Sequence, residues 1–142
     1  MSDRRTFLKQ SCGLCASMLG MGLVLPALNS CASIATIDAN LSHGAIEIPL
    51  QNFAADNNLV LVKNKALEFD IAIVKLGEGN FRAFNLECSH QSNPLIPTKS
   101  GFYCNAHGSS FSFEGKAMKA PAQNPLQEFK LELRGDHLVL MV

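Results

Sequence analysis

From Ala45 onward, apolar residues recur at every second position in short runs, which is the pattern of half-buried β-strands. The run AIEIPL shows it most clearly, because Ile46, Ile48 and Leu50 are each separated by one residue. Three more short runs rich in Leu, Ile, Val and Phe follow, namely NLVLVKN, LEFDIAIVKL and, after the turn GEGN, FRAFNL. Each of these runs predicts a strand.

The C-terminal segment LQEFKLELRGDHLVLMV predicts two strands joined at residues 134–136, where Gly135 supplies the positive φ of the turn. No run after residue 45 has the i, i+3, i+4, i+7 spacing of an amphipathic helix. We therefore predict an all-β domain over residues 46–142, a small antiparallel β sandwich or barrel.

The alternation breaks between Leu86 and Leu126, where four prolines and three glycines interrupt the chain. Loops carried on a rigid sheet are where binding sites are usually built. We expect a loop-rich subdomain over about residues 86–126 that carries the chemistry of the protein.

The first 31 residues differ from the rest and have the form of an export signal. Arg4, Arg5 and Lys9 precede an apolar stretch, CGLCASMLGMGLVLPAL, as in a signal peptide. The sequence RRTFLK resembles the twin-arginine signal, whose translocase carries folded, cofactor-loaded proteins. Cys12 and Cys15 form a CxxC pair inside the apolar stretch, so we expect them to be removed with the signal.

The segment LNSC resembles a lipoprotein processing site, at which Cys31 becomes the acylated first residue and anchors the chain to a membrane. Cleavage by ordinary signal peptidase after Ala32 or Ala35 is the second alternative. The third is an uncleaved anchor over residues 12–28, which is short for a membrane span. We expect an exported protein on the periplasmic side of a bacterial membrane, held there by a lipid.

Residues 32–45, ASIATIDANLSHGA, are small, polar and aperiodic, and predict a tether between the anchor and the domain. Fully extended, such a tether reaches on the order of 45 Å.

The composition excludes one class of partner. Twelve Lys and Arg balance twelve Asp and Glu, and the chain has no basic run beyond its N-terminus. A nucleic-acid-binding surface needs a clustered positive charge. We therefore expect no nucleic-acid partner.

Two of the five cysteines and two of the four histidines lie within 20 residues, as Cys88, His90, Cys104 and His107. Thiolates and imidazoles together suit a transition metal. Three interpretations are open: two unrelated pairs, a structural Cys2His2 zinc site, or a 2Fe-2S cluster in which two thiolates hold one iron and two imidazoles the other. The interleaved order Cys, His, Cys, His and the absence of a helix pattern favour the cluster.

The motifs CSH and CNAHGSSF are similar to the two cluster loops of the Rieske iron-sulfur family, and APAQNPL, at residues 120–126, is similar to its proline loop. This resemblance implies that Cys88 and Cys104 bind the buried iron and that His90 and His107 bind the outer iron near the surface. It also implies one-electron transfer, at a potential in the range of roughly −150 to +300 mV.

Five positions refine the potential that the resemblance implies. Ser109 stands where high-potential members have a serine that donates to a bridging sulfide, and Phe111 replaces a tyrosine that donates to a cysteine sulfur. Asn93 and Ala106 stand where the cytochrome bc subclass has a disulfide. Gln91 replaces the apolar residue that follows the first histidine in that subclass. We expect a potential below that of the quinol-oxidising members.

The sequence thus predicts a one-electron carrier with redox proteins as partners, and it shows no catalytic site of its own. The alternative is the small iron-sulfur subunit of a periplasmic oxidoreductase, cytochrome bc-like or arsenite-oxidase-like. A zinc-stabilised binding module is the remote alternative. His43 and His137 have spacings unrelated to the motifs, and we interpret them as turn or solvated histidines.

Overall fold

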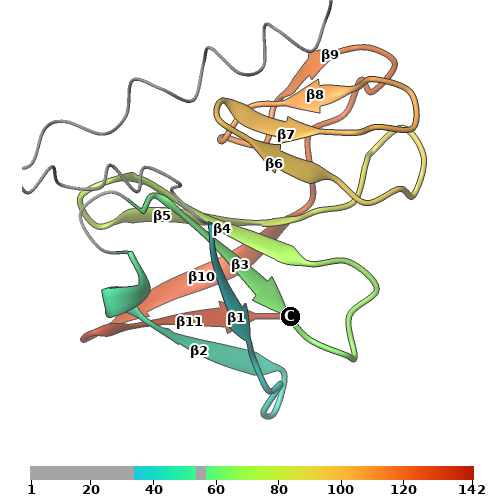
Figure 1. The fold of residues 1–142 in the computed structure, drawn as a ribbon. Coiled ribbons are helices and arrows are strands. Elements are labelled where there is room, and N and C mark those ends of the chain that lie inside the picture. The colour runs from blue at the N-terminus through green and yellow to red at the C-terminus, as the bar shows by residue number, and fades with distance from the viewer. Residues whose placement is uncertain (1–33, 54–56) are drawn as a thin grey trace, which may run out of the picture. The chain divides into compact units, whose positions relative to one another are not determined.

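The computed structural model describes residues 34–53 and 57–142 (Figure 1). The predicted signal, the CxxC pair and Cys31 lie outside these residues. Over the described part, no helix is long and apolar enough to cross a membrane. The strands are β1 Ala35–Asp38, β2 Ala45–Pro49, β3 Leu59–Lys63, β4 Ile71–Gly77, β5 Asn80–Asn85, β6 Ile96–Thr98, β7 Gly101–Tyr103, β8 Ser110–Phe111, β9 Ala117–Lys119, β10 Glu128–Arg134 and β11 His137–Met141, with one short 3-10 helix, η1 Leu50–Asn52. The predicted all-β fold is confirmed.

Seven strands form a curled sheet in the order β1-β3-β4-β5-β10-β11-β2 (Figure 1). All neighbours in it are antiparallel except β1 and β3, which run parallel. Its turns have the chemistry that the sequence predicts, since Gly79 and Gly135 both adopt positive φ at hairpin ends.

The inside of the curl holds a hydrophobic core whose members come from alternate positions of the strands. In the pairing of β11 with β2, for example, Leu138 lies opposite Ile48 and Leu140 opposite Ile46. Burying one such side chain contributes about 1.5–3 kcal/mol to folding. The core comprises Ile46, Ile48, Phe53, Val60, Val62, Ile71, Ile73, Ala83, Leu138 and Leu140.

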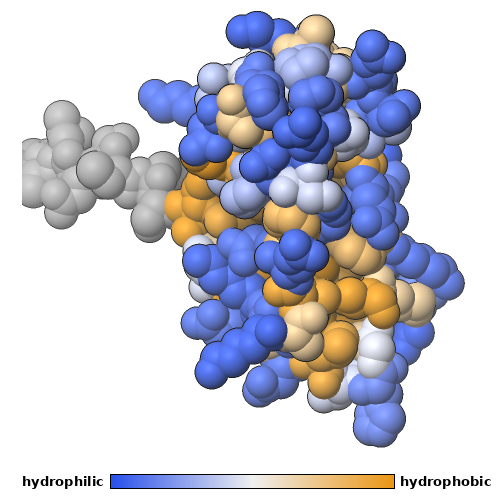
Figure 2. Space-filling model, turned by 90° about the vertical axis from the view of Figure 1, so that its right-hand side faces the viewer, coloured by the Kyte–Doolittle hydropathy of each residue, from blue (hydrophilic) through white to orange (hydrophobic). Residues whose placement is uncertain are grey.

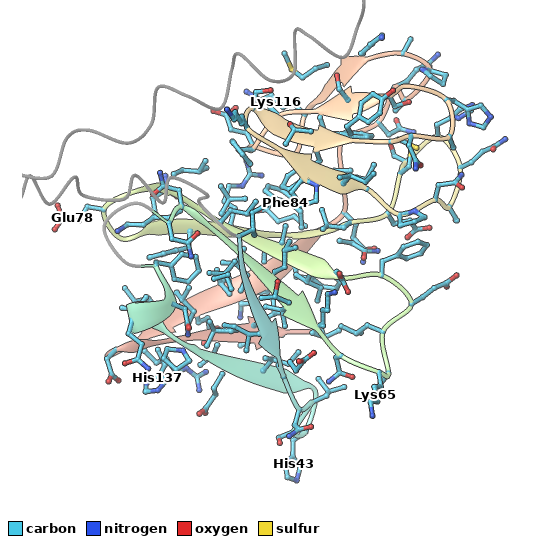
Figure 3. The ribbon with its side chains drawn as sticks, viewed as in Figure 1. His43, Lys65, Glu78, Phe84, Lys116 and His137 are labelled. Carbon is cyan, nitrogen blue, oxygen red and sulfur yellow. The ribbon has the colours of Figure 1, made fainter. Side chains whose placement is uncertain are left out.

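The strands in the middle of the chain are buried on both faces. The segment IAIV of β4 is apolar at consecutive positions because Ile71 and Ile73 face the curl, whereas Ala72 and Val74 belong to a second core. Phe84 of β5 joins this second core and lies between the two sheets (Figure 3).

The second sheet, in the order β6-β7-β8-β9, belongs to an insertion between β5 and β10 that we call the loop subdomain, residues 86–127. Its strands have only two or three residues each. Gly101 is required in β7, because its φ is +147° and a Cβ there would lie 2.0 Å from the backbone oxygen of Phe111.

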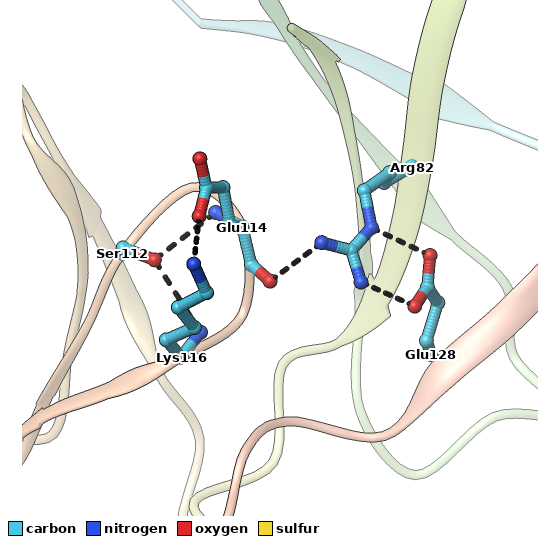
Figure 4. A network of polar contacts seen from close by, with 5 residues as sticks. All are labelled: Arg82, Ser112, Glu114, Lys116 and Glu128. Carbon is cyan, nitrogen blue, oxygen red and sulfur yellow. Dashed lines mark hydrogen bonds and ion pairs between the residues drawn. The ribbon is translucent and has the colours of Figure 1, made fainter.

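Arg82 of β5 connects the two sheets (Figure 4). Its Nε donates to Oε1 of Glu128 in β10 at 2.7 Å, and its Nη1 donates to the backbone oxygen of Glu114 in the loop subdomain at 2.9 Å. The guanidinium also lies 4.9 Å from the ring centroid of Phe84. One side chain therefore fixes the β8–β9 turn against the larger sheet.

The structure corrects the predicted tether. Residues 35–38 are not an unstructured linker but strand β1, in which Ala35 and Ile37 are half-buried and register with Val60 and Val62 of β3. The pairing continues to Ala39, whose amide donates to the oxygen of Lys63 at 2.9 Å. The sequence does not predict this strand, because four residues are too few to show a period. Strand β1 forms because its backbone pairs with β3.

Candidate metal centre

Two loops of similar construction hold the Cys and His residues. In the first loop, residues 88–95, the amide of Cys88 donates to the oxygen of Asn93 at 2.9 Å. In the second loop, residues 104–109, the amide of Cys104 donates to the oxygen of Ser109 at 2.9 Å. Gly108, with a φ of +81°, allows the second loop to close. Each loop therefore returns on itself directly after its cysteine.

The loops place the two kinds of side chain at different depths. Cys88 and Cys104 are 3% and 1% exposed, and both are free thiols in the second hydrophobic core. His90 and His107 are exposed, with ring centroids 5.1 Å apart and planes at 87°. The chain thus forms a buried pair of thiols beside a surface pair of imidazoles.

The surroundings of Cys88 favour its thiolate. Burial raises the pKa of this thiol, but hydrogen bonds from the backbone amides of His90 and Gln91 lower it. Hydrogen bonds from Cys104 and the Ser109 hydroxyl lower it further, and the pKa ends below its ordinary value. A thiolate is the form in which cysteine binds a metal.

The donor set fits a 2Fe-2S cluster. Both cysteines belong to one core and the two imidazoles lie side by side at the surface. One pair of sulfur ligands and one pair of nitrogen ligands suit two irons with different ligands.

The proline loop, residues 120–126, is fastened to both other loops. The Ser89 hydroxyl donates to the oxygen of Asn124 at 2.7 Å, and the amide of Ala122 donates to Oγ of Ser109 at 3.0 Å. The hydrogen bond of Ser89 is not expected from the sequence, because its partner Asn124 lies on another loop.

Ser109 and Phe111, the two residues expected to affect the potential, are both buried. Ser109 is fully buried; its Oγ accepts the amide of Ala122, and its own proton is directed to a sulfur, that of Cys88. Phe111 is 2% exposed and belongs to the same core as both cysteines.

The remaining sequence-predicted positions lie as follows. Asn93 caps the first loop through its backbone oxygen, and Ala106 is exposed in the second loop. Gln91 lines a hollow of about 370 Å³ between the first loop and the proline loop, together with His90 and Pro125. His43 and His137 lie at opposite ends of β2 in the larger sheet, away from the loop subdomain (Figure 3). The structure therefore places His90 beside His107 and both cysteines in one core, and it leaves the other two histidines apart.

Comparison with known proteins identifies the class. The family model described as "Rieske [2Fe-2S] domain" matches residues 46–130. The chain belongs to this family, whose cofactor is a 2Fe-2S cluster and whose chemistry is electron transfer.

One curated relative is the ferredoxin component of the alkene monooxygenase system of Xanthobacter autotrophicus. It is 36% identical over 77 residues, which are 51% of this chain and 62% of the relative. The match therefore spans less than two thirds of that protein's length.

Two solved structures share the fold. The plasma membrane Rieske protein of the cyanobacterium Synechocystis PCC 6803 has a TM-score of 0.56 and 21% identity, over 66% of this chain and 95% of that one. A chain of the complex of reduced oxygenase and oxidized ferredoxin in carbazole 1,9a-dioxygenase has a TM-score of 0.53 and 16% identity, over 70% and 94%.

Proposed function

We propose that Cys88 and Cys104 hold the inner iron of the cluster and that His90 and His107 hold the outer iron. The observation that carries the proposal is the buried pair of thiols next to the exposed pair of imidazoles. Bound there, the cluster supplies reversible one-electron chemistry. The chain excludes water from the thiols and leaves the imidazole edges accessible, so electrons enter and leave at the histidines.

The four histidines allow a matched test. We expect His90→Ala and His107→Ala to abolish the paramagnetic resonance signal of the dithionite-reduced protein, whose average g value lies below that of four-Cys clusters. His43→Ala and His137→Ala are the controls and should keep the signal and two irons per chain. Full signal in either of the first two variants would disprove the ligand assignment. A wild-type protein that contains one zinc ion in place of iron would favour the zinc-stabilised binding module.

Hydrogen bonds to the sulfurs should set the potential. A donor stabilises the electron-rich reduced form, so Ser109→Ala should lower the midpoint potential and Phe111→Tyr should raise it, each by tens of millivolts. A redox titration measures both. Variants that keep the cluster but titrate like the wild type would contradict these two roles.

We further propose that the chain is a mobile electron carrier whose acceptor is an oxygenase-type enzyme. The ferredoxin relative from a monooxygenase system supports a carrier over a permanent subunit. Reduced protein that stays monomeric in gel filtration and passes electrons to an added oxidoreductase would fit a carrier. A stable complex with cytochrome bc-like or arsenite-oxidase-like subunits after mild solubilisation would favour the alternative.

Export and lipid anchoring complete the proposal, on the sequence of residues 1–31. If Cys31 is acylated, only three residues separate it from β1, which leaves at most about 14 Å of extended chain. The domain would then work close to the membrane surface. Arg4→Lys with Arg5→Lys should retain the protein in the cytoplasm, and Cys31→Ala should release the exported domain in soluble form. Fractionation with fatty-acid labelling tests both.

A further inference from the structure

The end of the loop subdomain that carries His90 and His107 is free of charged side chains. Residues 88–98, 104–113 and 120–127 contain no Lys, Arg, Asp or Glu, although charged residues make up 17% of the chain. The contacts between the loops bring these three segments together around the histidines.

The surface is nevertheless hydrophilic. It presents exposed amide side chains, among them Gln91, Asn105, Gln123 and Asn124. In Figure 2 the upper part of the visible face, formed by the loop subdomain, is mostly coloured as hydrophilic, and the hydrophobic colour gathers over the larger sheet below. The three loops therefore present hydrogen-bonding side chains but no charged ones.

The outer face of the small sheet adds apolar area beside the second loop. Ile96 and Tyr103 are cross-strand partners, 49% and 39% exposed. The Tyr103 hydroxyl lies near Gly108, since a Cβ built on that glycine would be 3.8 Å from it. An exposed aromatic residue at such a position is a typical anchor of a protein interface.

Two charged residues of opposite sign flank these segments in the sequence. Glu87 precedes the first loop and lines the same hollow as His90 and Gln91, but its carboxylate already accepts hydrogen bonds from the Ser92 hydroxyl at 2.6 Å and the Asn85 amide at 3.0 Å. Lys119 ends β9 directly before the proline loop. The loops themselves carry no charge, so a charged group of a partner would lose its hydration on them without gaining an opposite charge.

We infer that these three loops, with Tyr103 and Ile96, form a docking surface for a redox protein whose own contact surface is uncharged and hydrogen-bonding. This inference rests on the proposed electron transfer through His90 and His107. A neutral partner matches the neutral loops, and recognition then depends on amide hydrogen bonds and apolar contact instead of long-range attraction.

The test uses the cluster-loaded protein and two oxidised protein probes. One is a blue-copper protein whose copper lies under an uncharged patch, and the other is a c-type cytochrome whose haem edge is ringed by lysines. In each reaction one electron leaves the reduced cluster and reduces Cu(II) to Cu(I) or Fe(III) to Fe(II). Stopped-flow rates are measured between about 0.01 and 0.2 M salt, where the Debye length falls from about 30 Å to below 10 Å.

We expect the wild-type rate with the blue-copper protein to change by less than about threefold over this range, against the ten- to thousandfold effect of steered association. Gln123→Glu and Gln123→Lys should both slow that reaction by about tenfold, because either sign leaves an unpaired charge in the contact. Asn105→Glu and Asn105→Lys provide a second pair. Gln51→Glu and Gln51→Lys, at the exposed Gln51 of η1, are the matched controls and should leave the rate unchanged.

Acceleration by one sign of charge at Gln123 would overturn the inference, because a charged partner surface would then be favoured. A steep salt dependence of the wild-type reaction with the lysine-ringed cytochrome would overturn it as well. Failure of the proposed function is distinguishable, because it would appear beforehand as a reduced sample without the Rieske-type resonance signal.

Discussion

The seven-stranded sheet and the loop subdomain are stabilised in different ways. The larger sheet has strands of four to seven residues around a core of Ile, Val and Leu side chains. The loop subdomain has strands of two or three residues, and its core includes both free cysteines. The comparison shows that one region folds by burying an alternating pattern, whereas the other has strands too short for such a pattern and is closed by hydrogen bonds between its loops.

The largest expected effect comes from removing a ligand. Cys88→Ser should abolish cluster binding and lower the amide exchange protection of residues 86–127, while β3 and β4 stay protected by the hydrophobic core. Iron analysis and hydrogen exchange by mass spectrometry measure the two effects. An equal loss of protection in both regions would show that they fold as one unit.

The converse change targets the larger sheet. Ile73 is completely buried in β4, so Ile73→Ala should lower the free energy of unfolding by about 2–5 kcal/mol without changing the resonance signal of the folded protein. Leu76, in the same strand but 38% exposed, is the control, and Leu76→Ala should cost less than about 1 kcal/mol. Urea unfolding compares the two variants. Similar losses of unfolding free energy would mean that the core inside the curled sheet is not the main source of stability.

A smaller effect is expected where the two regions touch. Gly115 has a φ of +77°, and a Cβ there would lie 2.5 Å from the Phe84 ring. Gly79 has a φ of +67° but no atom within 4 Å of its Cβ position. Gly115→Ala should cost about 2–4 kcal/mol, and Gly79→Ala, with only the backbone strain, about 1 kcal/mol. Equal decreases of the melting temperature in the two variants would contradict the close packing of Phe84 against Gly115 in the β8–β9 turn.

The smallest effect concerns the ion pair between Arg82 and Glu128. The hydrogen bond from Arg82 lowers the pKa of Glu128, outweighing the opposing effect of burial. A carboxylate with a lowered pKa stabilises the fold above its unfolded pKa and loses this contribution as the pH falls through its folded pKa. The Glu128 side chain is 43% exposed, so screening limits the loss in Glu128→Gln to about 0.5 kcal/mol at pH 7.

That difference should shrink as the pH falls and vanish once the pH lies below the lowered pKa of Glu128 in the folded protein, because protonated Glu128 resembles glutamine. Urea unfolding of both proteins across pH 3–7 measures it. A difference that stays constant with pH would exclude the ion pair as its cause.

The two regions also differ in how far they could be predicted from the sequence. The alternation of apolar and polar residues predicted the strand that contains Ile46 and Ile48 and the two strands of the C-terminal hairpin, because a half-buried strand has one apolar and one polar face. The short strands β6 to β9 could not be predicted, because two or three residues have no period and their pairing follows from the loops. The run LEFDIAIVKL was longer than its strand, since β4 begins only at Ile71.

For the site, the motifs indicated the Cys and His pairs that the structure brings together. Neither the hydrogen bond from Ser89 to Asn124 nor the hollow beside Gln91 could be predicted, because each depends on segments more than 30 residues apart in the chain. The absence of charge in the loops is visible in the sequence, but it acquires meaning only when the fold places the three segments side by side.

Strand β1 has a consequence for self-association. It pairs with β3 and so occupies backbone groups that would otherwise form an open sheet edge, a common starting point for aggregation. Cleavage after Ala35 would remove the first residue of this strand, and a chain shortened past Asp38 would expose the edge of β3 entirely. The residues that follow the predicted signal therefore replace the apolar edge of β3 with that of β1, a four-residue strand with Thr36 and Asp38 exposed, and a short, polar edge offers less to a second copy.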